Sequence, residues 1–271
     1  MADPKAMPFL RWAGGKRQIT KALLERVPNG FAGQYLEPFL GAGSLFFALA
    51  PERSILSDAN PRLIDVYRQI AQNPSAVRRE LQRHIRLHSR EHYYETRYSY
   101  NHGAHSAAQA GRFIYLNKAC FNGIFRVNQR GDFNVPKGSK DKLSVPSQQE
   151  FSLISAQLGK AALQAEDFEV ALGRALKNDF VYLDPPYPAL NGTAYFTHYT
   201  ADRFDERSQV RLAECVHRIN NSGIRFLMSN ADTGTIRRLY RSFRLEEIPV
   251  TRFVSCKGTR AAASELLIRN Y

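Results

Sequence analysis

The chain lacks long apolar runs and is poor in cysteine. No stretch of its 271 residues approaches the roughly 18 consecutive apolar residues of a membrane-spanning helix, so we expect no membrane contact. The first residues, through Arg17, hold no apolar segment before a small-residue cleavage site, so a secretory signal is not expected. Cys120, Cys215 and Cys256 are odd in number and show no metal-ligand or redox spacing. These absences predict reduced thiols in a protein that stays in the cytoplasm.

Acidic residues are fewer than basic ones. Lysine and arginine number 38 against 25 aspartates and glutamates, which gives a formal net charge of +13. Such an excess is typical of proteins that bind a phosphate backbone. The hydrophobic fraction of 44% and the aromatic fraction of 11% are those of a folded chain. We therefore predict a polyanionic partner, although a basic protein without one would have the same composition.

Apolar strand patterns alternate with helical patterns along most of the chain. Strands are predicted at residues 34–39, 54–58, 161–165, 180–183, 224–229, 243–250 and 264–270, and helices at 44–49, 147–158, 168–177, 205–221 and 233–240. From Pro61, which suits a first helical turn, to residue 120 the pattern is helical and rich in arginine. Residues 121–135 predict a β-hairpin with a turn at 129–132, and a lysine-rich segment follows at 136–146.

This order of elements predicts an α/β fold. The simplest architecture is a Rossmann-like, doubly wound sheet formed by residues 1–60 and 161–271. Residues 61–160 would form a helical and β-hairpin insertion between its two halves.

A glycine turn follows the first predicted strand. Gly41 and Gly43 allow a sharp turn and a close ligand, and the helix that begins at Ser44 offers unpaired amide groups. Asp58 ends the next strand, where its carboxylate would accept hydrogen bonds from ribose hydroxyls. The pattern predicts a nucleoside-bearing ligand, although such turns also occur without one.

A proline-rich motif follows the strongly apolar strand at 180–183. In Asp184-Pro185-Pro186-Tyr187 the prolines hold the backbone extended, so that a carboxylate, the Pro185 carbonyl and an aromatic ring converge. An exocyclic amine on a base is a poor nucleophile until two acceptors hold its hydrogens. Asp184 and the Pro185 carbonyl suit that task, and Tyr187 would stack on the base. The alternative is a stiffened strand exit with a buried tyrosine.

These motifs, in this order, resemble the Dam-type DNA adenine N6-methyltransferases, which are class alpha amino-methyltransferases. In that family the cofactor motif precedes the recognition insertion and the DPPY motif follows it. The resemblance covers nearly the whole chain and includes residues 9–16, 37–44, 57–60, 115–117, 121–123, 131–136, 195–197, 258–260 and 265–267. It implies methyl transfer from S-adenosyl-L-methionine, without a metal, to adenine N6 in GATC or a related short site. The segment Lys137-Gly138-Ser139 departs from the aromatic residues that the family carries there.

The resemblance also assigns cofactor and catalytic residues. Lys16 would lie near the cofactor's carboxylate, Asp58 would bind its ribose, and Asp167 with Phe168 would contact its adenine ring. On position alone, Trp12 would be a core anchor and Lys16 a solvated cation. The implied cofactor set is Trp12, Gly14, Gly15, Lys16, Glu37, Pro38, Phe39, Gly41, Gly43, Ser44, Asp58, Asn60, Asp167, Phe168 and Asp184, and the catalytic set is Asp184, Pro185, Pro186 and Tyr187.

The insertion is expected to read DNA. Adenine N6 is hidden in the base stack, so the target base must rotate out of the duplex. Arg126 suits two hydrogen bonds to guanine O6 and N7, with a nonspecific phosphate contact as the alternative. The implied DNA-binding set is Arg11, Asn122, Ile124, Arg126, Pro136, Lys137 and Lys140. We expect a monomer or weak dimer on double-stranded DNA, in a bacterial nucleoid or a phage-infected cell.

Three other classes remain open. A ribosomal-RNA adenine methyltransferase would share the chemistry and the charge. A protein glutamine methyltransferase normally has Asn where Asp184 stands. An inactive relative used as a repressor would not need an intact Asp184 and Tyr187.

Three histidines suggest a further, weaker possibility. His84, His88 and His92 are spaced by four residues, so they would share one helical face and bind a metal. The arginines between them favour a basic, DNA-facing or solvated helix instead.

Overall fold

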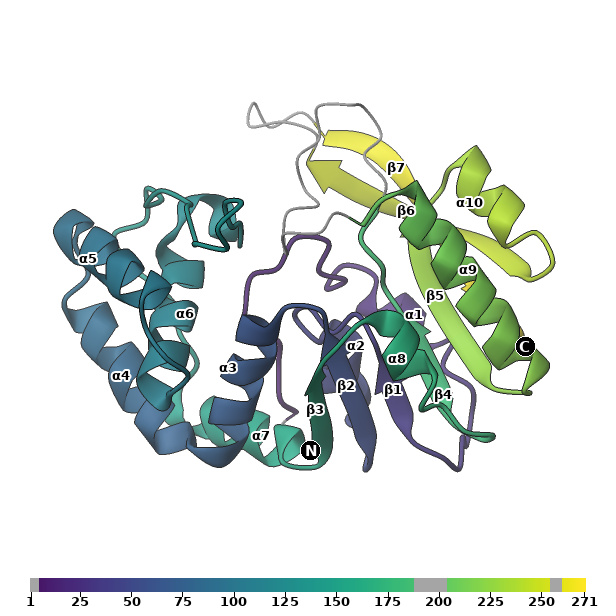
Figure 1. Ribbon diagram of the computed structural model, residues 1–271, viewed down its shortest axis with the longest axis horizontal. Coiled ribbons are helices and arrows are strands. Elements are labelled where there is room, and N and C mark those ends of the chain that lie inside the picture. The colour runs from purple at the N-terminus through teal and green to yellow at the C-terminus, as the bar shows by residue number, and fades with distance from the viewer. Residues whose placement is uncertain (1–4, 188–203, 254–259) are drawn as a thin grey trace.

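A largely parallel sheet forms the centre of the molecule. The computed structural model describes residues 5–187, 204–253 and 260–271 (Figure 1). Within these residues, seven strands pair in the order β3-β2-β1-β4-β5-β7-β6. Strands β1 to β5 are parallel, whereas β7 is antiparallel to both β5 and β6. The strands are β1 (Tyr35–Glu37), β2 (Ser54–Asp58), β3 (Ala161–Ala165), β4 (Phe180–Leu183), β5 (Arg225–Ala231), β6 (Arg244–Phe253) and β7 (Arg260–Arg269). The predicted α/β class is confirmed.

The central strands are buried on both faces. Alternate residues of a strand point to opposite faces, and in β4 Phe180 and Tyr182 join one apolar core while Val181 and Leu183 join the other. Helices α1 (Thr20–Leu24), α2 (Ser44–Leu49) and α3 (Pro61–Gln72) contribute to the first core. Helices α8 (Phe168–Leu172), α9 (Glu206–Asn221) and α10 (Gly234–Leu239) contribute to the second (Figure 1). Fully covered parallel strands explain the continuous apolar runs in the sequence.

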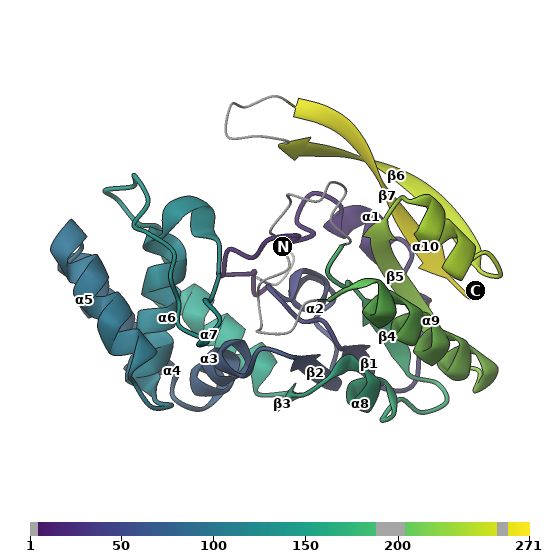
Figure 2. The same ribbon diagram turned by 45° about the horizontal axis from the view of Figure 1, so that its top comes forward.

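The chain leaves the sheet after β2 and returns at β3. Between them lie α3, α4 (Pro74–Arg86), α5 (Arg90–Asn101), α6 (Ala107–Ala119) and α7 (Gln148–Leu158), which confirms the predicted helical stretch. Side chains accept hydrogen bonds from first-turn amides at Asn60 for α3, Ser89 for α5 and Ser106 for α6. Figure 2 shows α4, α5 and α6 together at one side of the sheet. Among the described helices, none combines the length and apolarity needed to cross a membrane.

The predicted hairpin is only partly formed. The turn is present, because the side chain of Asn128 accepts hydrogen bonds from the backbone of Arg130 and Asp132 at 2.9 Å each. The flanking strands are reduced to isolated antiparallel bridges, Val127 with Phe133 and Cys120 with Lys137. The reason lies in competing partners: positive φ at residues 122 and 123 breaks the extended backbone, and α5 side chains bond to the backbone of residues 133–135. We call residues 121–138 the recognition turn, after the DNA-reading role that the sequence analysis predicts for this segment.

Several other predictions need correction. Helix α1 was not predicted, α8 ends at Leu172 rather than at residue 177, and β6 and β7 are longer than expected. The three histidines do not share one helix, because α4 ends at Arg86 and α5 begins at Arg90. His84 is buried rather than solvated, its Nδ1 lies 3.0 Å from Nε2 of His92, and burial lowers its pKa to about 4. Residues 195–197, 258–259 and Cys256 lie outside the described residues.

Candidate active site

The glycine turn joins three segments of the chain at the end of β1. Gly41 and Gly43 have φ angles of 47° and 65°, as a left-handed turn requires. The amide of Gly41 donates to Asp58 Oδ2 at 3.0 Å, and the Tyr67 hydroxyl donates to the Gly41 carbonyl at 2.7 Å. A Cβ at residue 41 would lie 2.9 Å from Cδ1 of Trp12. The turn is therefore held between the end of β2, helix α3 and the N-terminal segment.

Asp58 organises this turn through both carboxylate oxygens. Its Oδ1 accepts the amide of Asn60 at 2.9 Å, while Oδ2 accepts that of Gly41. Burial raises the pKa of Asp58 to about 6, against the lowering effect of the two amide hydrogen bonds. Asn60 in turn caps α3. Asp58, the residue predicted to bind the ribose, thus also fixes the backbone around the site.

We predict that this carboxylate makes cofactor binding depend on pH. With a pKa of about 6, about a tenth of Asp58 is ionised at pH 5, so affinity there falls about tenfold relative to pH 7 if only the ionised form accepts the ribose hydroxyls. Affinity falls rather than rises on acidification, because protonation of the carboxylate removes acceptors. Calorimetric titration of the wild type and of Asp58→Asn at each pH measures this. Equal pH dependence in the two proteins would assign the titration to another group.

The end of β4 carries a buried ion pair. Lys16 Nζ lies 2.7 Å from Asp184 Oδ1, and the side chains are 4% and 19% exposed. The same Nζ donates to the Gly14 carbonyl at 2.6 Å and lies 4.6 Å from the ring centroid of Tyr187. The N-terminal glycine segment and the proline motif therefore meet at one site. The resemblance placed Lys16 at the cofactor's carboxylate, whereas its partner in this structure is the carboxylate of Asp184.

Two buried hydroxyls support Asp184 from neighbouring strands. Ser229 on β5 donates its proton to Asp184 Oδ1 at 3.0 Å. Tyr182 on β4 lies 2.9 Å from Ser229 Oγ, and because the single serine proton is already donated, the tyrosine is the donor. Neither role could be predicted from the sequence, since a polar residue within an apolar strand is also compatible with packing. Both described contacts fall on Oδ1, so the carboxylate is oriented from one side.

Opposing effects set the protonation of Asp184. Burial is the largest cause and raises its pKa, Lys16 lowers it by charge and hydrogen bond, and Ser229 lowers it further. Gln209 on α9 donates to the Pro186 carbonyl at 3.2 Å, which fixes the proline motif from the other side. The carboxylate at the strand end is thus positioned by three elements, and Lys16 favours its charged form.

The N-terminal segment also closes a cavity of about 310 Å³. Trp12, Gly15 and Ser44 from the predicted cofactor set line it together with Asn122 and Ile124 from the predicted DNA set, and Arg11 lies there too. Ser44 Oγ is buried at the start of α2 and has no hydrogen-bond partner among the described residues. A volume near the lower end of ligand pockets and an unpaired hydroxyl beside a glycine turn fit a polar, nucleoside-bearing cofactor.

An aromatic group flanks the glycine turn on the other side. Phe39 stacks on Phe168 with ring centroids 5.4 Å apart, and Phe204 lies edge-on to both. Asp167 caps α8 and pairs with Arg211 at 2.7 Å. Phe39, just past β1, and Phe168, at the start of α8, are therefore neighbours. Pro38 is buried beside them, and Glu37 is buried and accepts the Tyr35 hydroxyl at 2.8 Å.

The recognition turn presents cations next to the N-terminal segment. The side chain of Asn117 bonds to both the amide and the carbonyl of Arg11, and a Cβ at residue 123 would meet Arg11 Cδ at 2.4 Å. Lys118, which the sequence prediction missed, has its pKa lowered to about 8, first by burial and then by Arg11, Arg17 and Lys140. Three neighbouring cations disfavour the charged form of this lysine, which indicates a concentrated positive surface.

The remaining predicted DNA residues lie on the recognition turn or just beyond it. Arg126 and Asn122 are exposed, and Arg126 Nε donates to Asn134 Oδ1 at 2.9 Å. The carbonyl of Pro136 accepts the amide of Phe121, and Lys137 pairs with Cys120 in a bridge. The Lys140 carbonyl lies 3.0 Å from His88 Nε2. Arg126, Pro136, Lys137 and Lys140 do not line the 310 Å³ cavity, so the predicted DNA set divides between the cavity and the surface beside it.

The seven-stranded sheet agrees with the fold of S-adenosylmethionine-dependent methyltransferases. The family model of D12 class N6 adenine-specific DNA methyltransferases matches residues 12–253, and the chain belongs to this family. The chain is 35% identical to the Type II methyltransferase M1.LlaDCHI of Lactococcus lactis subsp. cremoris, over 97% of this chain and 95% of that protein. It is 33% identical to the Type II methyltransferase M.MjaIII of Methanocaldococcus jannaschii, over 97% and 99%. A DNA adenine methylase of Vibrio cholerae is 34% identical over 97% and 95%.

This membership confirms the predicted enzyme class. The chain is an adenine-specific DNA methyltransferase of the D12 class, so its partner is DNA and the family's chemistry uses S-adenosylmethionine.

Proposed function

We propose that this enzyme methylates N6 of an adenine rotated out of duplex DNA, within GATC or a related short site. The observation that carries the proposal is the buried Lys16–Asp184 pair at the end of β4, whose carboxylate is still 19% exposed. A carboxylate paired with an ammonium at the edge of a sheet is placed to accept a hydrogen bond from an amine. S-adenosylmethionine supplies the electrophilic methyl group.

Asp184 and the Pro185 carbonyl hold the two hydrogens of the amino group. This arrangement favours a pyramidal nitrogen, whose lone pair then points at the methyl donor. Lys16 and Ser229 fix Oδ1 at 2.7 and 3.0 Å, so Oδ2 is the oxygen that accepts from N6. Tyr187 stacks on the base, and the protein's contribution is mainly positioning. Asp184 acts as an acceptor rather than a strong base, because the proton leaves only as the methyl group transfers.

The cofactor binds over the glycine turn. Asp58 accepts its ribose hydroxyls, Asp167 and Phe168 contact its adenine ring beside Phe39, and Ser44 offers its unpaired hydroxyl. Trp12 covers the turn, as its contact with residue 41 supports. The rest of the implied cofactor set surrounds these residues.

Residues 61–160 form the recognition domain, and residues 1–60 with 161–271 form the catalytic domain. Support comes from the chain leaving the sheet after β2 and returning at β3. Arg126 reads guanine in the major groove, while Lys137, Lys140 and Lys118 contact phosphates. The positive surface around Lys118 supports the phosphate contacts.

We predict that Arg126→Ala relaxes discrimination at one guanine. Loss of a bidentate contact costs about 1–3 kcal/mol, so the preference of methylation for that base pair falls by about 5- to 150-fold. Specificity constants on duplexes changed at single base pairs measure this. Arg130→Ala, in the same turn and equally exposed, is the matched control. A uniform loss on all duplexes would instead make Arg126 a phosphate contact.

The reaction itself is tested with a labelled cofactor. Duplexes that differ at one base pair are incubated with the enzyme, digested and analysed as nucleosides. We expect label in N6-methyladenine only, on duplexes but not on ribosomal RNA. Recovery of N4-methylcytosine would refute the proposed target atom.

A further inference from the structure

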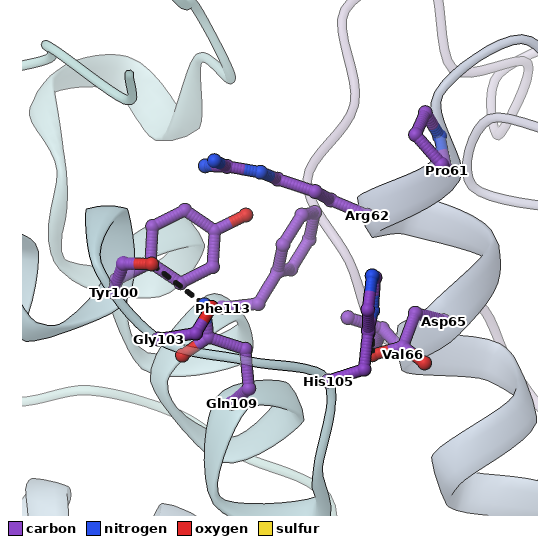
Figure 3. A pocket seen from close by; sticks show the side chains of 9 residues that line it. All are labelled: Pro61, Arg62, Asp65, Val66, Tyr100, Gly103, His105, Gln109 and Phe113. Carbon is purple, nitrogen blue, oxygen red and sulfur yellow. Dashed lines mark hydrogen bonds and ion pairs between the residues drawn. The ribbon is translucent and has the colours of Figure 1, made fainter. Parts of the chain in front are cut away.

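A second, smaller cavity lies between α3 and the junction of α5 and α6. Arg62 and Asp65 from α3, Tyr100 from the end of α5, His105 from the connecting loop and Phe113 from α6 surround a volume of about 190 Å³ (Figure 3). Ligand pockets usually measure roughly 300–1,000 Å³, so this cavity has room only for a small group. None of these residues has a part in the methyl-transfer site.

Two polar groups of this cavity carry hydrogens without an acceptor. Tyr100 is 1% exposed, and neither its hydroxyl nor Nη1 of Arg62 donates to an acceptor among the described residues. The guanidinium lies 5.0 Å from the ring centroid of Tyr100, so both groups face the same space (Figure 3). Burial raises the pKa of Tyr100 against the lowering effects of the Arg62 charge and of a weak hydrogen bond from Arg62, so the hydroxyl keeps its proton and is a donor. Unpaired buried donors destabilise a fold, and an anionic acceptor that binds both would relieve that cost.

The surroundings hold this arrangement in place. Gln109 Nε2 donates to the Tyr100 carbonyl at 2.6 Å, and the Tyr100 ring packs edge-on against Phe113 at 6.0 Å. Asp65, the acidic residue of the lining, is engaged with His105 Nδ1 at 3.1 Å. No ion pair of Arg62 with a carboxylate occurs within the described residues, so its positive charge is available to a ligand.

We propose that this cavity binds a phosphate group, with Arg62 and Tyr100 donating hydrogen bonds to its oxygens. Guanidinium and hydroxyl donors in a space of this size suit a tetrahedral oxyanion. The source that the position favours is the DNA backbone: Asn101, next to Tyr100, bonds to the backbone of Phe133 in the recognition turn. Phe113 also stacks 6.4 Å from Trp12, which covers the glycine turn. The cavity thus lies between the DNA-reading surface and the cofactor site.

This inference deepens the proposed function, because it depends on DNA as the partner but not on which sequence is read. Tyr100→Phe is the central test, since it removes only the unpaired hydroxyl and keeps the ring packing. If the hydroxyl binds phosphate, affinity for duplex DNA falls about fivefold, as for the loss of one hydrogen bond. If the hydroxyl has only a structural role, Tyr100→Phe should bind DNA with unchanged affinity. Its melting temperature should then be higher than that of the wild type, because an unsatisfied buried group is removed.

Arg62→Met tests the charge. Fluorescence anisotropy on GATC and unrelated duplexes should show about tenfold weaker binding to both. The slope of log Kd against log salt should fall by about 0.9, the value for one phosphate contact. Arg79→Met, an exposed arginine on α4, removes the same charge and should leave the slope unchanged. The weaker binding by Arg62→Met is expected to be equal on both duplexes. A wrongly proposed target sequence would instead alter only the preference between them, so the two failures are distinguishable.

Inorganic phosphate distinguishes the source. The melting temperature of the wild type and of Tyr100→Phe is measured with added phosphate at constant ionic strength. A free phosphate is the ligand if phosphate raises the melting temperature of the wild type only and the two proteins bind DNA with equal affinity. Weaker DNA binding by Tyr100→Phe and Arg62→Met identifies the DNA backbone. If Tyr100→Phe binds both DNA and phosphate as the wild type does, the proposal is overturned.

Discussion

Asp184→Ala should lower the rate of methyl transfer by about 10³-fold while leaving DNA affinity nearly unchanged. The change removes one of the two acceptors for the amino group, and loss of a single preorganised hydrogen-bonding group at a reacting centre costs on the order of 10²–10³ in rate. It also leaves the buried ammonium of Lys16 without its partner at 2.7 Å. Single-turnover methylation at saturating cofactor and DNA measures the chemical step.

Graded variants separate positioning from the loss of the carboxylate. Asp184→Asn keeps the shape and one oxygen, so its rate should fall less than that of Asp184→Ala. Ser229→Ala removes only the hydrogen bond of 3.0 Å to Oδ1, and about a tenfold loss is expected. Glu214→Ala, an exposed carboxylate on α9, is the control. A wild-type rate in Asp184→Ala would remove this residue from the reaction.

Lys16→Met should shift the pH dependence of methylation. In the wild type the ammonium lowers the pKa of Asp184 against the raising effect of burial. Without that opposite charge the carboxyl stays protonated to higher pH. The rate at pH 7 should therefore fall by about tenfold or more and recover as the pH rises, because deprotonation restores the acceptor.

The pH profile distinguishes two roles for this lysine. If Lys16 instead binds the cofactor's carboxylate, as the family resemblance implies, Lys16→Met raises KM for the cofactor and leaves the profile unmoved. Lys21→Met, an exposed lysine on α1, controls for the loss of one positive charge. Comparing the profiles at saturating cofactor isolates the effect on Asp184.

The elements of the sheet were predictable from local pattern. Residues 54–58, 161–165 and 180–183 were predicted as strands with the boundaries that β2, β3 and β4 have, because short apolar runs between turn residues favour strands. Of these, β4 is buried throughout, whereas β3 lies at the sheet edge and is only partly buried. The recognition turn was less predictable. Its alternating residues favour strands, but side chains of α5 compete for the backbone bonds that a strand needs, and that competition is tertiary.

The candidate site likewise has features that were predictable from the sequence and features that were not. The placement of Gly41, Asp58 and Asp184 was predictable, because each ends or follows a strand and the ends of parallel strands meet at one edge. The pairing of Lys16 with Asp184 and the support from Ser229 were not, since these residues are distant in sequence and no local period relates them. The same holds for Lys118, whose significance depends on three cations gathered by the fold.

The most direct test is the structure of the enzyme with a target duplex and an unreactive cofactor analogue. The account predicts an adenine outside the base stack, with N6 within about 2.7–3.2 Å of both Asp184 Oδ2 and the Pro185 carbonyl. A target adenine still stacked in the duplex, with the Asp184 carboxylate turned away from it, would contradict the account.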